Sequence, residues 1–378
     1  MTLPEQSPTL ESMFNPWVSD LERVLQWRSL SSPQQESLQH RLLHFTQSHQ
    51  DAIAFCPPDS TAIAQVIPRW LHLFREGIPQ LQNHPALAPL FHPPQRGQTL
   101  ITAWRLWIPW AMHLTHLKHS PYGDRPLIQG VLGVQGAGKT TLGQVMEILL
   151  AILGRSLLNL SIDDFYLTYD ERQALRQRDP RLLWRGPPGT HDVSLAIQTL
   201  DDLRRGVAMV PIPRFEKSLH GGQGDRTPSE GVGPVDVVWF EGWLVGCEPV
   251  ADSRFDHPLP APIVSAGDRQ FARDCNQRLR SYQPLWQRLD QWAVLVPGDY
   301  RWSKRWRQEA ERLRIAAGGA GLSDKAVSEF VDYFWRALHP DLFVMPWLDL
   351  TSTPTERSPH CLVEIQSDRR IGRLWTRT

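Results

Sequence analysis

The spacing of apolar residues changes at about residue 127, after which short apolar runs alternate with longer amphipathic segments. The apolar runs have the length of buried strands and occupy Leu127–Val134, Ser156–Ile162, Ala208–Ile212, Val235–Glu241, Trp292–Val296 and Cys361–Ile365. The amphipathic segments have helical spacing, over Thr140–Leu153, Asp170–Gln177, Asp192–Arg205, Arg269–Arg288, Tyr300–Ala317 and Ser323–Leu338. This alternation predicts an α/β fold, a mostly parallel sheet with helices on both faces. The glycine-rich stretch His220–Gly233 is interpreted as a loop.

The first 95 residues carry helical patterns instead. We expect helices at 17–27, 32–49 and 61–73, the second capped by Ser32 and the third interrupted or kinked at Pro68. A proline-rich, polar stretch, His84–Pro94, is interpreted as a linker. We therefore expect a helical N-terminal region of unassigned role, residues 1–95, and a second domain, residues 96–378. An aromatic segment, Thr99–Lys118, is expected to pack as a core helix beside that domain.

Composition narrows the class of protein but does not identify it. Forty basic residues balance forty acidic ones, so charge gives no sign of a nucleic-acid or membrane partner. No apolar run approaches the ~18 residues of a membrane span, and Met1–Gln6 lacks a secretion-signal pattern. The four scattered cysteines indicate reduced thiols and no zinc site or disulfide framework, which favours a cytoplasmic location; they are Cys56, Cys247, Cys275 and Cys361.

The clearest chemical signal is the segment 133–140, GVQGAGKT, which reads G-x-x-x-x-G-K-[ST] between a predicted strand and a predicted helix. Its glycines let successive backbone N–H groups turn toward phosphate oxygens, and the helix begins at the anion. Lys139 would reach the β- and γ-phosphates, and Thr140 would offer a hydroxyl to Mg²⁺. The nucleotide-binding candidates are Gly133, Gly136, Ala137, Gly138, Lys139, Thr140 and Thr141. The alternative is a glycine-rich turn that matches by chance.

Two acids follow the second predicted strand, at the sheet edge where ligands of parallel sheets bind. Asp163 is placed near the γ-phosphate, where a carboxylate can accept a proton from an attacking hydroxyl. Asp164 could cap the next turn or contribute through water to the metal, and it is also a candidate for the substrate site, as is Tyr166. The alternative is an Asp pair that only caps a helix.

Another acid ends the apolar run 237–241, VVWFE. A carboxylate at that point of a P-loop unit holds Mg²⁺ or its water opposite the P-loop hydroxyl. We therefore expect Glu241 and Thr140 to bind the metal; a structural turn is the alternative reading.

Charged loops between these motifs have the composition of an acceptor-substrate site. The candidates are His191, Asp192, Arg214, Lys217 and Arg226. Asp192 is also a natural helix N-cap, His191 has a structural reading, and Arg226 has a solvated-surface reading. The basic run 305–314 is either a solvated helix face or a lid that brings arginines to the phosphates.

These motifs resemble the P-loop kinases of the phosphoribulokinase, uridine kinase and pantothenate kinase group. Within that group the chain is most similar to the D-glycerate 3-kinases, which include a photorespiratory enzyme of plants. The matching segments are GAGKTTL (136–142), SIDDFYLT (161–168), RGPPGTHD (185–192), IPRFEKSLHGGQGDR (212–226) and FEGWLVG (240–246). The resemblance covers about 127–366 and not the first 95 residues.

The resemblance implies a P-loop NTPase-type fold and an ATP- and Mg²⁺-dependent small-molecule kinase. It implies Asp163 as the catalytic carboxylate and a lid near 300–320 that carries Arg307, Arg312 and Arg314, with Lys139 on the phosphates. We expect phosphorylation of D-glycerate to 3-phosphoglycerate, with the acceptor carboxylate on Arg214, Lys217 or Arg226. Two alternatives stay open: a kinase for another hydroxylated metabolite, such as pantothenate or a nucleoside, and an ATP-hydrolysing switch protein.

Overall fold

The computed structural model describes residues 15–119, 124–316, 318, 321–348 and 358–377. Its centre is a six-stranded sheet with the strand order β2-β5-β1-β6-β7-β8. The strands are β1 (Leu127–Gly133), β2 (Leu157–Ser161), β5 (Val237–Gly242), β6 (Gln291–Pro297), β7 (Cys361–Ile365) and β8 (Ile371–Thr376). Neighbours are parallel, except that β8 runs antiparallel to β7 at the edge. The mostly parallel sheet predicted from the sequence is confirmed.

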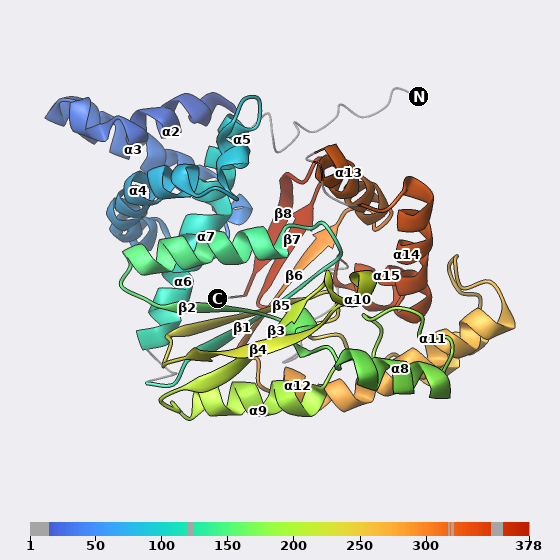
Figure 1. Cartoon of the computed structure of the whole chain (residues 1–378). Helices are drawn as coiled ribbons and strands as arrows, with labels where there is room; N and C mark the ends of the chain where they lie inside the picture. Colours follow the sequence, from blue (N-terminus) through green and yellow to red (C-terminus); the bar gives the residue numbers. More distant parts are fainter. Residues whose placement is uncertain (1–14, 120–123, 317, 319–320, 349–357, 378) are drawn as a thin grey trace, which may run out of the picture.

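Helices cover both faces of this sheet, which is why β1 and β6 are buried along their whole length. In Figure 1, α7 (Lys139–Ile152) lies above the strands, and α9 (Val193–Arg204) and α12 (Gln283–Trp286) lie below them. The remaining helices of this part are α8 (Tyr169–Arg178), α11 (Ala266–Leu279), α13 (Trp302–Ala316), α14 (Asp324–Ala337) and the short α15 (Pro340–Phe343). The helices predicted after residue 127 are present with ends shifted by a few residues, except that the single helix expected over 269–288 is divided into α11, the 3-10 turn Arg280–Tyr282 and α12.

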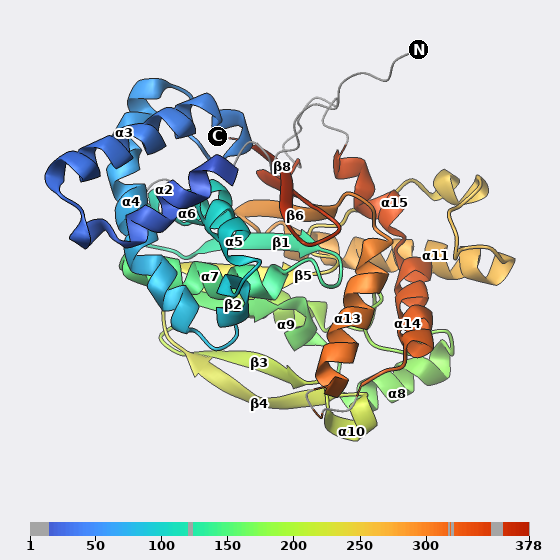
Figure 2. The same ribbon diagram turned by 90° about the horizontal axis from the view of Figure 1, so that it is seen from above.

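Two strands form a separate antiparallel ribbon, β3 (Val210–Glu216) and β4 (Asp225–Val232), joined through the single turn α10 (Leu219–Gly222). The sequence interpretation was wrong here, because β3 does not join the main sheet and much of the expected loop is β4. No residue of β4 is buried, so no apolar alternation marked it. In Figure 2 the ribbon runs along one side of the molecule, and α10 lies at the same end as α8, α13 and α14.

The N-terminal region contains α2 (Val18–Leu25), α3 (Ser32–Ser48), α4 (Ser60–Asn83), α5 (Arg96–Thr102) and α6 (Ile108–His119). A five-residue π-helix, Ala103–Trp107, joins α5 to α6. The described chain as a whole also contains short 3-10 turns, at Asn15–Trp17, Trp27–Ser29, Gln50–Ala52, Ala88–Phe91, Ile162–Phe165, Asp252–Asp256, Arg280–Tyr282 and Met345–Leu348. All three expected helices are present. The predicted interruption is wrong, because α4 continues through Pro68 to Asn83.

Two further details of this region differ from the sequence interpretation. The cap of α3 lies one residue earlier than expected: Ser31 N–H donates to Gln34 Oε1 at 2.8 Å, which completes a reciprocal capping box. The stretch expected to be a linker contains a 3-10 turn and buries Leu87 and Phe91 in the core.

The aromatic segment packs as core, as expected. Trp104 and Trp110 are fully buried, and the Trp110 ring lies 5.3 Å from that of Trp239 on β5. Within the described part of the chain, no helix has both the length and the apolar character needed to cross a membrane.

A buried arginine ties this region to the last strand of the sheet. Arg105, in the π-helix, is 1% exposed. Its guanidinium donates to the carbonyl oxygens of Ala52 at 2.8 Å, Gly372 at 2.9 Å and Ile371 at 3.4 Å. Burial lowers the pKa of Arg105 to about 10, so the group stays charged at neutral pH. The N-terminal helices and β8 are therefore joined by a charged, internally satisfied contact.

Candidate active site

A cavity of about 430 Å³ lies at the carboxyl edge of the sheet. Strands β1, β5 and β2 are adjacent and parallel, so the residues that follow them meet at this edge. Nine sequence-predicted site residues line the cavity: Gly136, Lys139, Thr140, Asp163, Asp164, Tyr166, Lys217, Glu241 and Arg307. Four separate motifs and the basic helix thus contribute to one cavity.

The P-loop follows β1 and leads directly into α7. Gly136 and Gly138 have φ of +77° and +88°, conformations that favour glycine. A Cβ on Gly136 would also lie 2.8 Å from Cβ of Trp306 in α13, so position 136 has no room for a larger residue. Gly133, Ala137, Gly138 and Thr141 belong to the same segment but are not among the lining residues. Their expected contribution is through the backbone, as in other phosphate-binding loops.

Lys139, at the start of α7, donates to the carbonyl oxygens of Gly133 at 2.8 Å and Val134 at 3.2 Å. Burial lowers the pKa of its ammonium group, and the carboxylates of Glu241 and Asp163 oppose that shift. Its Nζ lies 4.0 Å from Glu241 Oε2. The fold therefore holds a lysine cation between the P-loop and the neighbouring strand.

Glu241 and Thr140 meet across the edge of the sheet, where Thr140 Oγ1 donates to Glu241 Oε1 at 2.8 Å. A hydroxyl and a carboxylate are ligands that suit Mg²⁺. Among the described residues, no group of three or more His, Cys, Asp or Glu side chains is arranged to hold a metal. The pair fits a metal whose other ligands are phosphate oxygens and water, and does not form a complete protein cage.

Asp163 receives two hydrogen bonds inside the cavity. Lys217 Nζ donates to Oδ2 at 2.7 Å, and the Tyr166 hydroxyl donates to Oδ1 at 2.9 Å. Burial alone would raise the pKa of Asp163, but Lys217, Tyr166 and the nearby His191 outweigh it and hold the pKa below its ordinary value. Asp163 is therefore an ionised carboxylate at neutral pH.

Asp164 caps the 3-10 turn that follows β2. Its Oδ2 accepts from Ser161 N–H at 2.9 Å in a capping box, and burial raises its pKa. Capping thus accounts for Asp164, although it also lines the cavity, whereas among the described residues the Asp163 carboxylate accepts hydrogen bonds only from cavity side chains.

His191 and Asp192 lie behind the cavity and not on its wall. The His191 ring stacks on Tyr166 at 4.6 Å, and its Nδ1 lies 2.8 Å from the Tyr282 hydroxyl. Burial lowers the pKa of His191 to about 4, so it is neutral at pH 7. Asp192 caps α9 by accepting from Leu195 N–H at 3.0 Å. His191 therefore packs against Tyr166, and Asp192 caps a helix, which are the structural alternatives that the sequence left open.

Two expected substrate arginines are not among the residues that line the cavity. Arg214 Nη2 pairs with Glu230 at 3.0 Å, and Arg214 Nη1 lies 3.5 Å from Asp164. Side chains alternate along a strand, so Arg214 faces opposite to Phe215, which lines the cavity. Arg226 donates to Tyr166 O at 2.7 Å and pairs with Asp192 at 3.1 Å. Both arginines are thus held by acids and by a backbone carbonyl outside the lining of this cavity.

Only one of the three expected lid arginines reaches the cavity. Arg307 lines it and pairs with Glu311 at 2.7 Å. Arg314 pairs with the same glutamate but lies two helical turns, roughly 10 Å, further along α13. Arg312 lies on another face of the helix and pairs with Asp324. Arg312 and Arg314 are thus separated from the phosphate-binding elements by helix geometry.

Sequence reasoning missed a cation and an aromatic wall. Arg185 lines the cavity, together with Phe215, Trp243, Phe330 and Phe334. Arg185 belongs to the conspicuous segment RGPPGTHD, and that membership was the available signal. The helix α14, which supplies Phe330 and Phe334, carried no chemical motif, and its packing over the cavity follows from the tertiary fold.

The chain has relatives among known kinases. The chain is 36% identical over 253 residues to the chloroplastic D-glycerate 3-kinase of Arabidopsis thaliana, a match of 62% of this chain that spans only about half, 53%, of that relative. It is 31% identical over 275 residues to the uncharacterised kinase mug58 of Schizosaccharomyces pombe, covering 68% of this chain and 94% of the relative. A solved structure, D-glycerate 3-kinase from Cryptococcus neoformans var. grubii, aligns with a TM-score of 0.61 at 28% identity, over 71% of this chain and 97% of that one. No family model matches.

Proposed function

This chain belongs to the kinase family of these relatives, and on that premise we propose that it transfers the γ-phosphoryl group of ATP to D-glycerate, giving 3-phosphoglycerate and ADP. Two relatives bear the name D-glycerate 3-kinase, one matched in sequence and one in structure. The observation that carries the proposal is the cavity in which the P-loop lysine and the Thr140–Glu241 pair lie with an ionised, doubly hydrogen-bonded Asp163.

The P-loop side of the cavity would hold the nucleotide. Backbone N–H groups around Gly136 and Gly138 and the start of α7 suit a polyphosphate, and Lys139 supplies the cation. Thr140 and Glu241 would hold Mg²⁺ with water and phosphate oxygens. When bound, this ion neutralises charge between the β- and γ-phosphates.

Asp163 would act on the acceptor. Its carboxylate is fixed by Lys217 and Tyr166, so it can orient the primary hydroxyl and take its proton as the oxygen attacks the γ-phosphorus in line. Arg307 lines the cavity and would stabilise the charge that spreads over the equatorial phosphate oxygens. Because phosphoryl transfer needs little covalent help, most of the barrier reduction would come from positioning and electrostatics.

A coupled assay of ADP release over a panel of acceptors tests this function. Glycerate should raise ADP release far above the acceptor-free rate, and NMR of the product should identify 3-phosphoglycerate. Turnover with pantothenate or uridine instead would replace the proposed acceptor. ATP hydrolysis that no acceptor accelerates would point to a switch protein and overturn the kinase proposal.

A further inference from the structure

Four cations line the described part of the cavity: Lys139, Arg185, Lys217 and Arg307. Three of them face an acid. Lys139 lies 4.0 Å from Glu241, Lys217 lies 2.7 Å from Asp163, and Arg307 lies 2.7 Å from Glu311. Arg185 differs, because within the described chain it forms no ion pair with a carboxylate. Its charge is therefore the one in this cavity without an acidic partner.

Neutral groups hold Arg185 in place. Its Nη1 donates to the carbonyl oxygens of Gly222 at 2.9 Å and Gln223 at 2.8 Å. Its guanidinium carbon lies 5.4 Å from the Phe215 ring centre and 5.8 Å from that of Tyr166. No hydrogen bond from Nε or Nη2 is formed to a described residue. The Nη1 end of the guanidinium is thus fixed, while its Nε–Nη2 edge, which can bind a carboxylate through two hydrogen bonds, has no hydrogen-bond partner among the described residues.

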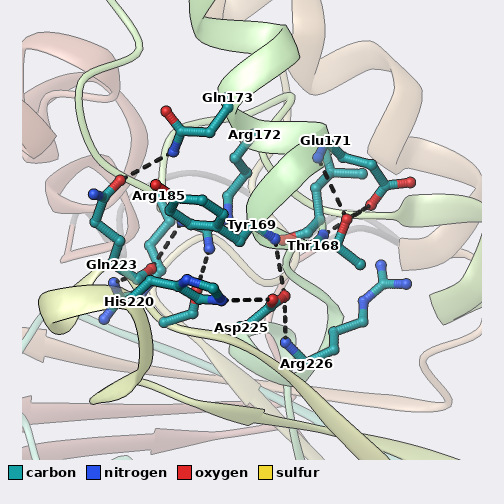
Figure 3. Close-up of polar contacts among 12 residues, drawn as sticks. Thr168, Tyr169, Glu171, Arg172, Gln173, Arg185, His220, Gln223, Asp225 and Arg226 are labelled. Atoms are coloured by element: carbon teal, nitrogen blue, oxygen red, sulfur yellow. Dashed lines mark hydrogen bonds and ion pairs between the residues drawn. The ribbon is translucent and has the colours of Figure 1, made fainter.

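The carbonyl oxygens that fix Arg185 are presented by an unusual turn at the tip of the ribbon. His220, Gly221, Gly222 and Gly224 all have positive φ, between +50° and +90°. The turn is itself anchored on α8. Figure 3 shows the His220 ring over Tyr169, with centres 4.0 Å apart, and Asp225 accepting from Tyr169 N–H and Arg226 N–H, each at 2.8 Å.

A second arginine holds the same turn but has a different position. Arg172 donates to Gln223 O at 2.8 Å and to Gly224 O, as Figure 3 illustrates. Arg172 is buried and does not line the cavity, and its pKa is lowered by burial and by the neighbouring Arg185 charge. The chain thus keeps two guanidinium groups close together, and only Arg185 extends into the cavity.

Resting on the proposed function, we propose that Arg185 recognises the carboxylate of the acceptor and sets specificity for anionic acceptors. Asp163 and Arg185 line the same cavity. Tyr166 contacts both of them, because its hydroxyl donates to Asp163 and its ring faces the Arg185 guanidinium. An acceptor held by its carboxylate on Arg185 would present its hydroxyl end to Asp163. This replaces the sequence-based choice of Arg214, Lys217 or Arg226.

The test compares glycerate with glyceramide, its neutral isostere, in the ADP-release assay. In Arg185→Met, kcat/KM for glycerate should fall about 30-fold or more, because a desolvated charge-assisted pair is lost. Glyceramide turnover should change less than about threefold, so that the discrimination between the two acceptors collapses. Parallel losses on both acceptors, or an unchanged ratio, would overturn the proposal.

Three further variants separate recognition from loop structure. Arg172→Met loosens the same turn without removing the cavity cation, so it should affect glycerate and glyceramide alike. Arg178→Met, an exposed arginine on α8, is the matched control for loss of charge. Arg185→Lys keeps the charge without the fork, and should lower the ratio by at least about threefold. Should the methionine variant fail to fold, an unchanged ratio in the lysine variant would overturn the proposal.

The same panel distinguishes this proposal from the proposed function. If the unmodified protein uses pantothenate and not glycerate, the glycerate assignment fails, and Arg185 is tested on pantothenate against its carboxamide. If the unmodified protein uses only neutral acceptors such as uridine, both proposals are overturned.

Discussion

Replacing Asp163 with Asn should separate catalysis from binding and folding in this cavity. The substitution keeps the size of the side chain but removes its charge. Two donors, Lys217 Nζ and the Tyr166 hydroxyl, converge on the two carboxylate oxygens at 2.7 and 2.9 Å. A carboxamide offers one acceptor oxygen, so one donor loses its partner.

The structure gives the relative size of the two effects. The Lys217 side chain is 59% exposed, so its pair with Asp163 contributes at most about 1 kcal/mol to the free energy of unfolding. The melting temperature should therefore fall by less than about 4 °C. Loss of a positioned general base lowers kcat by about 10²- to 10⁴-fold, which corresponds to roughly 2.7–5.5 kcal/mol in the barrier. The loss of turnover should thus far exceed the loss of stability.

The measurements are kcat by ADP release, ATP affinity by calorimetry, and thermal unfolding. Asp170→Asn is the control, because it removes the same charge from an exposed site on α8. ATP affinity should stay within about threefold of the unmodified protein, since Asp163 is not assigned to the nucleotide. A kcat above a tenth of normal would refute the base assignment. A matching loss of ATP affinity would instead make Asp163 a ligand of the nucleotide or its metal.

Three further predictions concern the same cavity. Lys139→Ala should abolish ATP binding and turnover together, because it removes the P-loop cation; calorimetry that still detects ATP at normal affinity would contradict the P-loop assignment. Lys217→Met should move the acid limb of the kcat/KM–pH profile to higher pH: Asp163 acts as base above its pKa, and without Lys217 burial raises that pKa. An unmoved limb would show that Lys217 does not tune the base. Gly136→Ala should weaken ATP binding and lower the free energy of unfolding by about 1–2 kcal/mol, because alanine is strained at φ +77° and its Cβ would clash with Trp306. Normal ATP affinity in this variant would contradict the role assigned to the Gly136 backbone.

The parts predicted correctly from the sequence depend on local backbone geometry, or on the rule that ligands of a parallel sheet bind at the carboxyl ends of its strands. Gly136 and Gly138 adopt positive φ, in line with the phosphate-binding turn that the pattern predicted. Thr140 and Glu241, 101 residues apart, come within hydrogen-bond distance because β1 and β5 are parallel neighbours. Neither result required knowledge of how loops pack.

The directions of individual side chains could not be predicted in the same way. Arg214 and Lys217 stand in one charged motif, yet one pairs with Glu230 and the other with Asp163. Which one enters the cavity depends on strand phase, and the sequence interpretation ended β3 at residue 212, before either side chain. Arg185 was passed over for a related reason, since the turn that fixes it lies in a stretch interpreted as a loop.

The contact between Arg105 and β8 also bears on how the chain folds as it is synthesised. Its partners Ile371 and Gly372 lie 266 and 267 residues further along the sequence. At ribosomal rates of about 5–20 residues per second, roughly 13–50 s pass before those carbonyl groups exist. Until then the guanidinium cannot be buried with all its present partners, because an unsatisfied buried charge is too costly. We therefore expect the Arg105 side of the N-terminal helices to stay solvated until the last strand has been synthesised.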